Sequence, residues 1–312
     1  MKSIIIKEFG APSVLQYTDV EMPVAGENEV LVKVKTLSIN PVDVKTRSGF
    51  AIAGSLKHLM PITLGWDISG TVVATNSTKF KIGDDVFGMV NFLGHGKAYA
   101  EYVAAPASHL ALKPAEISHE EAAAATLAAL TAYQVLTRHM KVGKGDRILI
   151  HAAAGGVGHY AVQIAKHLGA YVIATTSAAN RDFVNSLGAD EHIDYHSVKF
   201  EEATGMLDFV LDNMGGEYVA RSIAVVKPGG TVISIPTKVS PEDEALAKAK
   251  NISARFEMVE SNGEDMQQLA NLLAQGKIKS HVSATPGFNE MAKAHLLMES
   301  GRTVGKIVVV IK

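Results

Sequence analysis

The chain has 312 residues, which is more than one compact hydrophobic core usually fills, so we expect two domains. Apolar residues make up 47% of the sequence and charged residues 20%, and this composition excludes disorder over most of the chain. The formal net charge is −2 and there is no cysteine. Because there is no basic excess, we do not expect electrostatic binding of nucleic acid or of an anionic membrane. Because there is no cysteine, the chain has no disulfide bond and no cysteine-ligated zinc.

The first 120 residues predict a β-rich domain. Short runs with β-branched or alternating apolar residues occur at Ile4–Ile6, Glu29–Lys35, Gly70–Ala74 and Ala98–Val103, separated by clusters of Gly, Asn and Asp. The isoleucine run near the N-terminus is too short for a signal-peptide core, and no run of roughly 18 apolar residues could span a bilayer. We expect a cytoplasmic protein.

From Ser118 onward, strands and helices alternate. Ser118 and Glu121 form a Ser-x-x-Glu capping box that opens an alanine-rich helix. The following segments predict strands at Arg147–His151, Tyr171–Thr176, Glu191–Tyr195, Leu207–Asp212 and Thr231–Ile235, with helices at Val157–Leu168 and Asn180–Leu187. This alternation is typical of right-handed βαβ units, and so predicts a parallel sheet covered on both faces over residues 121–275.

The last segment, residues 276–312, offers a strand near Ile278–Ser283, a helix near Asn289–Glu299 and a Val/Ile strand at Lys306–Lys312. These pieces could rejoin the first domain, which would make the parallel-sheet domain an insertion. Composition alone does not decide this point.

A glycine-rich turn carries the strongest chemical signal. His151–Gly158 reads His-Ala-Ala-Ala-Gly-Gly-Val-Gly, follows a predicted strand and opens a predicted helix. Such a turn binds a dinucleotide when Gly155, Gly156, Val157 and Gly158 bring backbone N–H groups close to a pyrophosphate. The alternative is a tight strand–helix turn with no ligand.

The choice of cofactor is predicted from the end of the second strand of this domain. NAD sites usually carry Asp or Glu there, but residues 174–181 read Ala-Thr-Thr-Ser-Ala-Ala-Asn-Arg. Ser177 and Arg181 can donate to a 2′-phosphate, which a carboxylate would repel. We therefore predict NADPH; the alternative for Arg181 is a solvated cation at the start of a helix.

Several further motifs occur in a characteristic order: Asn-Pro-Val-Asp-Val-Lys at 40–45, Leu-Gly-Trp-Asp-Ile-Ser-Gly at 64–70, Tyr-Ala-Glu-Tyr at 99–102, Leu-Thr-Ala at 130–132 and Gly-Arg-Thr-Val-Gly-Lys at 301–306. With the glycine turn, the chain resembles the medium-chain dehydrogenase/reductase superfamily, and within it the zinc-independent quinone oxidoreductases and enone reductases. The resemblance implies an α/β protein in which a GroES-like β-rich domain is combined with a doubly wound Rossmann domain. It also implies a homodimer through edge strands, here near Ser253–Val259.

The same resemblance argues against a catalytic metal. Zinc-dependent members carry Cys where this chain has Asn40, and Gly-His-Glu where it has Gly65-Trp66-Asp67. His192 and His196 are four residues apart, but they fall on and after a predicted strand, where they would not face one point. We interpret them as surface histidines and expect no metal.

Site residues follow from the resemblance by position. It implies that Asn40, Asp43 and Thr131 lie beside the nicotinamide; the alternatives are a turn residue for Asn40 and a plain helix residue for Thr131. Further cofactor contacts are implied at Tyr195, Asn213 and Ile235, and an apolar substrate wall at Phe50 and Phe92. Core packing is the alternative for Tyr195, Ile235 and the two phenylalanines.

Without a metal, the remaining chemistry is hydride transfer to an acceptor that already delocalises negative charge. The leading hypothesis is an NADPH-dependent, zinc-independent reductase of a quinone or an α,β-unsaturated carbonyl. The alternatives are an NADP-dependent alcohol or carbonyl oxidoreductase, and a non-catalytic, crystallin-like nucleotide-binding protein.

Overall fold

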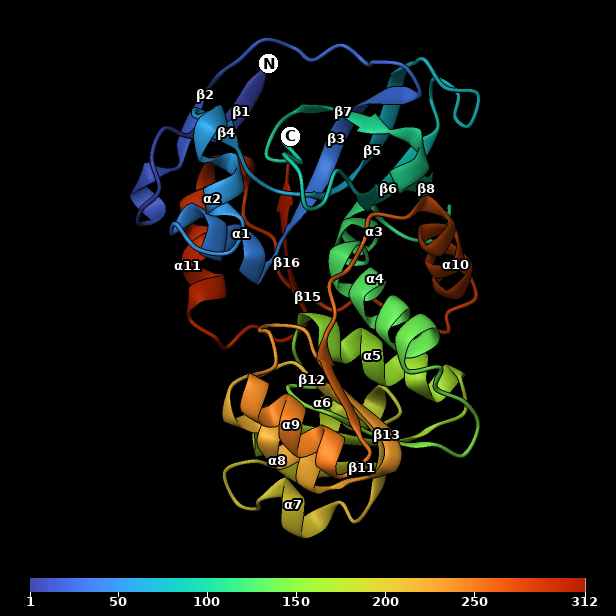
Figure 1. Ribbon diagram of the computed structural model, residues 1–312. Helices are drawn as coiled ribbons and strands as arrows, with labels where there is room; N and C mark the ends of the chain where they lie inside the picture. Colours follow the sequence, from blue (N-terminus) through green and yellow to red (C-terminus); the bar gives the residue numbers. More distant parts are fainter. Residues whose placement is uncertain (312) are drawn as a thin grey trace. The chain divides into compact units, whose positions relative to one another are not determined.

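The computed structural model describes residues 1–311 and divides into two units (Figure 1). Unit 1 comprises Met1–Leu130 together with the segment from Glu260 onward, and unit 2 comprises Thr131–Val259. The segment after Glu260 returns to unit 1 because its strand β16 (Lys306–Val310) pairs antiparallel with β3 (Glu29–Ile39). In Figure 1, β16 (red) therefore lies beside β3 (blue).

Unit 1 is built on a seven-stranded sheet with the order β15-β16-β3-β5-β6-β8, in which β7 also pairs with β3. Its other strands are β5 (Asp67–Thr75), β6 (Asp85–Met89), β7 (Tyr102–Pro106), β8 (Leu110–Leu112) and β15 (Val282–Ala284). A smaller sheet has the order β2-β1-β4 and consists of β2 (Gln16–Asp19), β1 (Lys2–Ile6) and β4 (Ile62–Thr63). Six apolar residues of β3 are buried in the core of unit 1: Val30, Leu31, Val32, Val34, Leu37 and Ile39.

Unit 1 also contains the helices α1 (Pro41–Arg47), α2 (Ala53–Leu56), α3 (His119–Ala124), α10 (Gly263–Ala274), α11 (Met291–Glu299) and the first half of α4 (Leu127–Gln134). Of these, α3, α10 and α11 pack on the sheet, and α1 packs on α11. Because α3 packs on β3 and β5 and α10 packs on β8, unit 1 extends to residue 130 and resumes at 260. The expected boundaries, 121 and 275, both fall inside this unit.

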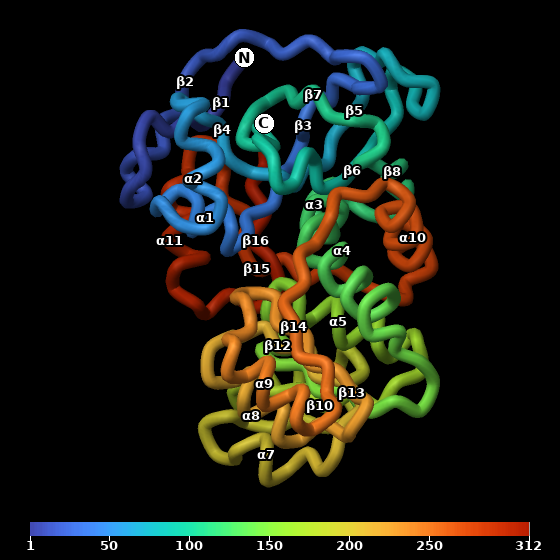
Figure 2. The backbone as a smooth tube through the Cα atoms, in the orientation of Figure 1, coloured from blue at the N-terminus to red at the C-terminus, as the bar shows by residue number. Residues whose placement is uncertain are grey.

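Unit 2 contains a six-stranded, all-parallel sheet with the order β11-β10-β9-β12-β13-β14. The strands are β9 (Arg147–Ile150), β10 (Tyr171–Thr176), β11 (Glu191–Asp194), β12 (Leu207–Asp212), β13 (Val226–Ser234) and β14 (Ser253–Phe256). The helices are α5 (Gly156–His167), α6 (Arg181–Ser186), α7 (Phe200–Ala203), α8 (Glu217–Ala224) and α9 (Pro241–Ala249). The strand order reverses at β9 and β12, so right-handed connections place α5 and α6 on one face and α8 and α9 on the other. The last two helices pack against each other (Figure 2).

Most of the predicted elements are present, with shifts where local pairing decides the bounds. The capping box at Ser118 is confirmed, with its hydroxyl oxygen accepting from the N–H of Glu121. The strand expected at 98–103 begins only at Tyr102, because Tyr99 donates its backbone N–H to Leu64. The turn expected at 227–230 lies within β13, and the strand expected near 278–283 is shorter and begins later, at Val282–Ala284.

Short helical turns connect the longer elements: η1 (Pro12–Val14), η2 (Lys57–Leu59), η3 (Ala107–His109), η5 (Ala178–Asn180), η6 (Phe288–Glu290) and the π-helical η4 (Val135–His139). A search of residues 1–311 for a helix both long enough and apolar enough to cross a membrane finds none.

Candidate functional site

Five strands of unit 2 end at the same edge of its sheet. Because β9–β13 are parallel, the residues after each strand meet at this carboxyl edge: the glycine turn after β9, Ser177 after β10, Tyr195 after β11, Asn213 after β12 and Ile235 after β13. The turn and Asn213 lie at β9 and β12, where the strand order reverses. This switch point is where open parallel sheets bind ligands.

The glycine turn has no room for a side chain at Gly158. Gly155 is the N-cap of α5, and Gly156, Val157 and Gly158 form the first turn of that helix, whose N–H groups lack intrahelical acceptors. A Cβ at Gly158 would lie only 2.3 Å from the carbonyl oxygen of Ala152. The backbone of Ala152 adopts a φ of +47°. The turn therefore exposes backbone amides and a helix N-terminus, a geometry that fits a pyrophosphate.

A buried amide oxygen lies beside this turn. Asn213 donates from Nδ2 to the carbonyl oxygen of His151 at 2.6 Å, while its Oδ1 is buried and has no hydrogen-bond partner within residues 1–311. An orphaned buried acceptor is costly, so this oxygen suits a donor that arrives with a ligand, such as a ribose hydroxyl. The switch point thus offers donors for phosphate and an acceptor for sugar.

His151 fixes that carbonyl group. Its ring is fully buried between the Thr175 hydroxyl, 3.0 Å from Nδ1, and the Ser222 hydroxyl, 3.2 Å from Nε2. Burial, with a contribution from the Arg221 guanidinium, lowers the pKa of His151 to about 3, so the imidazole is neutral. A neutral ring held at both nitrogens ties β9 to β10 and α8 and rigidifies the start of the turn.

The corner after β10 carries Ser177 and Arg181, the two residues predicted to contact the 2′-phosphate of NADPH. Ser177 is the N-cap of η5, and Arg181 is the exposed first residue of α6. Arg181 Nε lies 3.3 Å from Nδ1 of His192. The predicted residues Ser177 and Arg181 therefore both lie at this corner. His192, expected to be a surface histidine, lies there too and contacts Arg181.

Two further predicted cofactor residues lie at the same edge. Tyr195 is 51% exposed and stacks at a tilt on His196, so it is not a core residue. Ile235 is half-buried, and its backbone N–H donates to the Asp212 carbonyl oxygen at 3.1 Å, which fixes the chain as it leaves β13.

In unit 1, the predicted residues Asn40 and Asp43 belong to a buried polar cluster. Asn40 is the N-cap of α1, and its backbone N–H donates to Asp43 Oδ2 at 2.7 Å. Its side-chain Nδ2 donates to Asp67 Oδ2 at 2.7 Å, and its Oδ1 accepts from the Lys306 ammonium at 2.5 Å. Lys306 Nζ lies 3.9 Å from Asp67, whose Oδ1 accepts from the Leu127 N–H.

Burial dominates the electrostatics of this cluster, since Asn40, Asp43, Asp67 and Lys306 are each at most 1% exposed. It raises the pKa of Asp43 to about 7, against the opposing hydrogen bond from Asn40. Burial also raises the pKa of Asp67 and lowers that of Lys306, and the attraction between these two groups opposes both shifts. The cluster is a charge pair sealed from water, with the Asn40 carboxamide held between its members.

The other predicted residues are dispersed. Phe50 is 71% exposed, whereas the ring of Phe92 packs edge-on against Trp66 with centroids 5.4 Å apart. Thr131 lies in α4 as the first residue of unit 2 and is buried.

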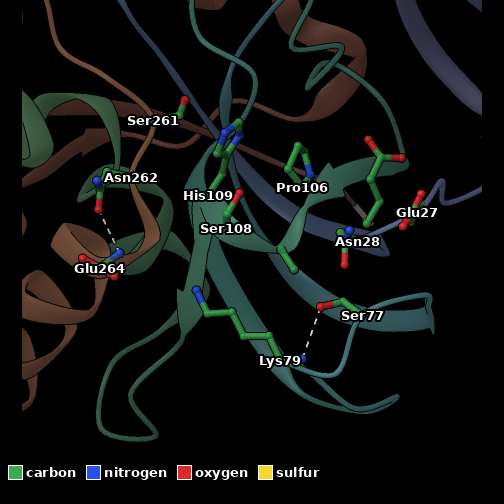
Figure 3. Close-up of a pocket in the computed structure, with 12 residues that line it drawn as sticks. Glu27, Asn28, Ser77, Lys79, Pro106, Ser108, His109, Ser261, Asn262 and Glu264 are labelled. Carbon is green, nitrogen blue, oxygen red and sulfur yellow. Dashed lines mark hydrogen bonds between the residues drawn. The ribbon is translucent and has the colours of Figure 1, made fainter.

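A separate cavity of about 810 Å³ opens in unit 1 and holds none of the predicted residues (Figure 3). Its polar groups serve the protein itself: Lys79 donates from Nζ to the Leu110 carbonyl, His109 accepts from the Asn91 N–H, and Asn262 caps α10 by accepting from the N–H of Glu264. We assign this cavity no part in the candidate site.

Comparisons with known proteins agree with this architecture. Residues 26–115 match the alcohol dehydrogenase GroES-like domain, and residues 187–309 match the zinc-binding dehydrogenase family. The 2-methylene-furan-3-one reductase of Solanum lycopersicum is 35% identical over 326 residues, 99% of this chain and 79% of that protein. The chain belongs to the medium-chain dehydrogenase/reductase superfamily. Within it, the chain belongs to the family of quinone oxidoreductases and alkenal/one reductases.

Solved structures of this family support the same assignment. The quinone oxidoreductase of Coxiella burnetii is 37% identical, with a TM-score of 0.95 over 100% of this chain and 99% of that chain. The Escherichia coli quinone oxidoreductase complexed with NADPH is 27% identical, with a TM-score of 0.87 over 99% of this chain and 100% of that chain. The expected fold class, a GroES-like β domain combined with a Rossmann domain, is confirmed.

One of the matching families is described as zinc-binding, but the residues of this chain do not fit a zinc ion. The chain has no cysteine, and by the resemblance Asn40 stands where zinc-dependent members carry Cys, while Trp66 and Asp67 replace the His-Glu of their Gly-His-Glu segment. The Asn40 and Asp67 side chains already bind each other. The Lys306 ammonium donates a hydrogen bond to the Asn40 Oδ1, and its positive charge would repel a divalent cation. The donor set at Asn40 and Asp67 therefore does not suit zinc.

Sequence reasoning missed two residues of these clusters. Lys306 enters the sequence analysis only in the terminal motif and at the start of a strand, because a lysine before an apolar run is usually exposed, whereas here it is buried. His192 gave no comparable signal, because its partners depend on the register between β10 and β11.

Proposed function

We propose that this protein is an NADPH-dependent reductase that transfers hydride to a quinone or an α,β-unsaturated carbonyl. The observation that carries the proposal is the carboxyl edge of the unit 2 sheet. There, a glycine turn with no room for a side chain at Gly158 lies beside the unpaired Asn213 oxygen. The end of β10 carries Ser177 and Arg181 and has no carboxylate.

Each part of this edge has a binding role. The backbone amides of Gly156, Val157 and Gly158 would hold the pyrophosphate, and Asn213 Oδ1 would accept from a ribose hydroxyl. Ser177 and Arg181 would donate to the 2′-phosphate. NADPH, when bound, supplies the hydride.

The choice of acceptor rests on the buried cluster of unit 1. Oxidation of a simple alcohol needs a Lewis acid or base at the oxygen, and the donor set at Asn40 and Asp67 does not fit zinc. Quinones and enones delocalise the negative charge that the hydride brings, so such acceptors mainly require orientation and exclusion of water. The name of the Solanum lycopersicum relative, a reductase of a conjugated methylene ketone, supports this class.

Binding and turnover test the proposal separately. Calorimetric titration should show tighter binding of NADPH than of NADH, and Arg181→Ala should weaken NADPH by about ten- to a hundredfold, the worth of one charge-assisted contact. Loss of NADPH absorbance with a panel of quinones and enones should then identify the acceptor.

Other outcomes would favour other functions. Oxidation of simple alcohols with NADP⁺ would favour an alcohol oxidoreductase. Tight NADPH binding without turnover of any acceptor would favour a non-catalytic nucleotide-binding protein. No binding of either nucleotide would contradict the proposal altogether.

We also propose a homodimer through β14, which is an edge strand of the unit 2 sheet. Light scattering on the purified protein should give twice the chain mass of 33.1 kDa. A monomeric mass would contradict the dimer without affecting the proposed activity.

A further inference from the structure

His192 links two strands and a helix at the corner after β10. Its Nε2 lies 2.7 Å from the Thr176 hydroxyl, and its Nδ1 lies 3.3 Å from Nε of Arg181. The ring is half-buried on the edge strand β11, so the contact joins β11 to the end of β10 and to the first residue of α6. The contact with His192 is the hydrogen bond that the structure gives the Arg181 side chain within residues 1–311.

The hydrogen bonds fix one tautomer of this ring. An arginine Nε always carries hydrogen, so Nδ1 of His192 must accept from Arg181. Nε2 then carries the ring proton and donates to Thr176, whose hydroxyl donates in turn to the Ser177 carbonyl oxygen at 2.9 Å. The hydrogen bonds therefore form one series: Arg181 donates to His192, His192 donates to Thr176, and Thr176 donates to the Ser177 carbonyl oxygen.

The charges around the ring favour its neutral form. Burial and then the Arg181 guanidinium lower the pKa of His192, while the Ser177 carbonyl and Asp194 oppose these effects. Asp194 is occupied, because its carboxylate accepts from the His196 N–H and from the Ser197 hydroxyl. His192 therefore remains an acceptor for Arg181.

The contact with His192 leaves the two terminal nitrogens of Arg181, Nη1 and Nη2, free to bind a ligand. Within the described part of the chain, the guanidinium is held only through Nε, so Nη1 and Nη2 form a fork with no protein acceptor. A fork of two N–H groups matches two oxygens of one phosphate. Because arginine loses much rotamer freedom on binding, a guanidinium already oriented binds more tightly than a free one.

We infer that His192 is a positioning residue for the 2′-phosphate of NADPH: it accepts from Arg181 Nε and thereby presents the Arg181 fork beside Ser177. This inference rests on the proposed use of NADPH. It makes discrimination between NADPH and NADH depend on a residue that need not touch the cofactor.

Three variants separate positioning from structure. His192→Phe removes both ring nitrogens, whereas His192→Asn retains an acceptor near the Nδ1 position. We expect His192→Phe to weaken NADPH binding by about three- to tenfold with NADH binding unchanged, and His192→Asn to stay within about twofold of the wild type. In an Arg181→Ala background, His192→Phe should have no further effect, because the histidine acts through the arginine.

Calorimetric dissociation constants for both cofactors decide the result. Equal weakening of NADPH and NADH by His192→Phe, or an additive effect in the Arg181→Ala background, would overturn the inference. If Arg181→Ala reduces NADPH affinity but His192→Phe does not, the inference fails and the proposed cofactor stands. If the wild type binds both nucleotides equally and Arg181→Ala changes neither, the proposed cofactor itself fails.

Discussion

The ammonium group of Lys306 donates a 2.5 Å hydrogen bond to the carboxamide oxygen of Asn40, 266 residues earlier in the chain. The same ammonium donates to the Ile39 carbonyl oxygen at 3.0 Å, so it joins β16 to the last residue of β3 and to the N-cap of α1. Its charge is 1% exposed and is balanced by Asp67 at 3.9 Å. A pair of this kind is costly to bury and still more costly to break.

Removal of the Lys306 charge should therefore destabilise the protein strongly. Lys306→Met preserves much of the side-chain volume but leaves Asp67 as an uncompensated buried carboxylate, with an expected loss of about 3–5 kcal/mol of unfolding free energy. Urea denaturation measures this loss. The matched control is Lys293→Met, which removes an exposed lysine paired with Glu290 and should cost less than about 1 kcal/mol. Similar losses in both variants would show that the buried ammonium adds no special stability.

Asp43 gives the same cluster a pH dependence. Burial raises the pKa of this carboxyl group from 3.8 to about 7 in the folded protein. Between these values the folded state binds more protons than the unfolded state, so the contribution of Asp43 to stability is full at low pH and is lost as pH rises towards 7. The variant Asp43→Asn carries no such charge and retains an oxygen that can accept from the Asn40 N–H.

Relative to the wild type, Asp43→Asn should therefore gain unfolding free energy as the pH rises from 4 to 7, by on the order of a few kcal/mol, and then level off. Denaturation midpoints at several pH values measure the difference. Asp19→Asn serves as the control, because the hydrogen bond from exposed Lys2 lowers the pKa of Asp19 and its effect should be flat above pH 5. A flat difference for Asp43→Asn would contradict the raised pKa.

Gly158 tests the shape of the glycine turn. A methyl group at this position would meet the Ala152 carbonyl oxygen at 2.3 Å, so the turn must move and its amides would leave their positions. Overpacking of this size costs about 1–3 kcal/mol. If that cost is met when the turn returns to its binding shape, NADPH binding to Gly158→Ala is expected to be about five- to 150-fold weaker. Calorimetry measures the affinity, and circular dichroism checks that the fold is retained.

Gly54→Ala provides the comparison, since no atom lies within 4 Å of a Cβ at that position in α2. It should leave cofactor affinity unchanged. If Gly158→Ala also binds NADPH normally, the turn does not carry the pyrophosphate.

The sequence predicted those features that depend on neighbours along the chain. The capping box at Ser118 and the strand Tyr171–Thr176 could be predicted because a cap needs only the next turn of helix, and a buried strand needs only an apolar run. The glycine turn belongs to the same class, since its steric requirement arises within residues 152–158.

Features that depend on distant partners could not be predicted. Asn40 was expected beside the nicotinamide, and that role stays a prediction; its partners Asp67 and Lys306 emerge only when β3, β5 and β16 are aligned. In the same way, the role of His192 depends on the parallel register that brings β11 beside β10. A period-2 pattern shows which face of a strand is buried but not which side chain of the next strand it meets.

The corner after β10 allows a final prediction about cofactor choice. Ser177→Asp would place a carboxylate where NAD-dependent proteins accept from the ribose 2′-hydroxyl and where a 2′-phosphate would be repelled. The backbone should tolerate the change, because Ser177 has an extended conformation open to any L-residue and its side chain makes no capping hydrogen bond that would be lost. We expect NADPH binding to weaken at least about tenfold while NADH binding is retained or improves. The control is Ser186→Asp, which adds the same charge at the exposed opposite end of α6 and should change neither affinity. Unchanged NADPH affinity in Ser177→Asp would mean that the 2′-phosphate does not bind at this corner.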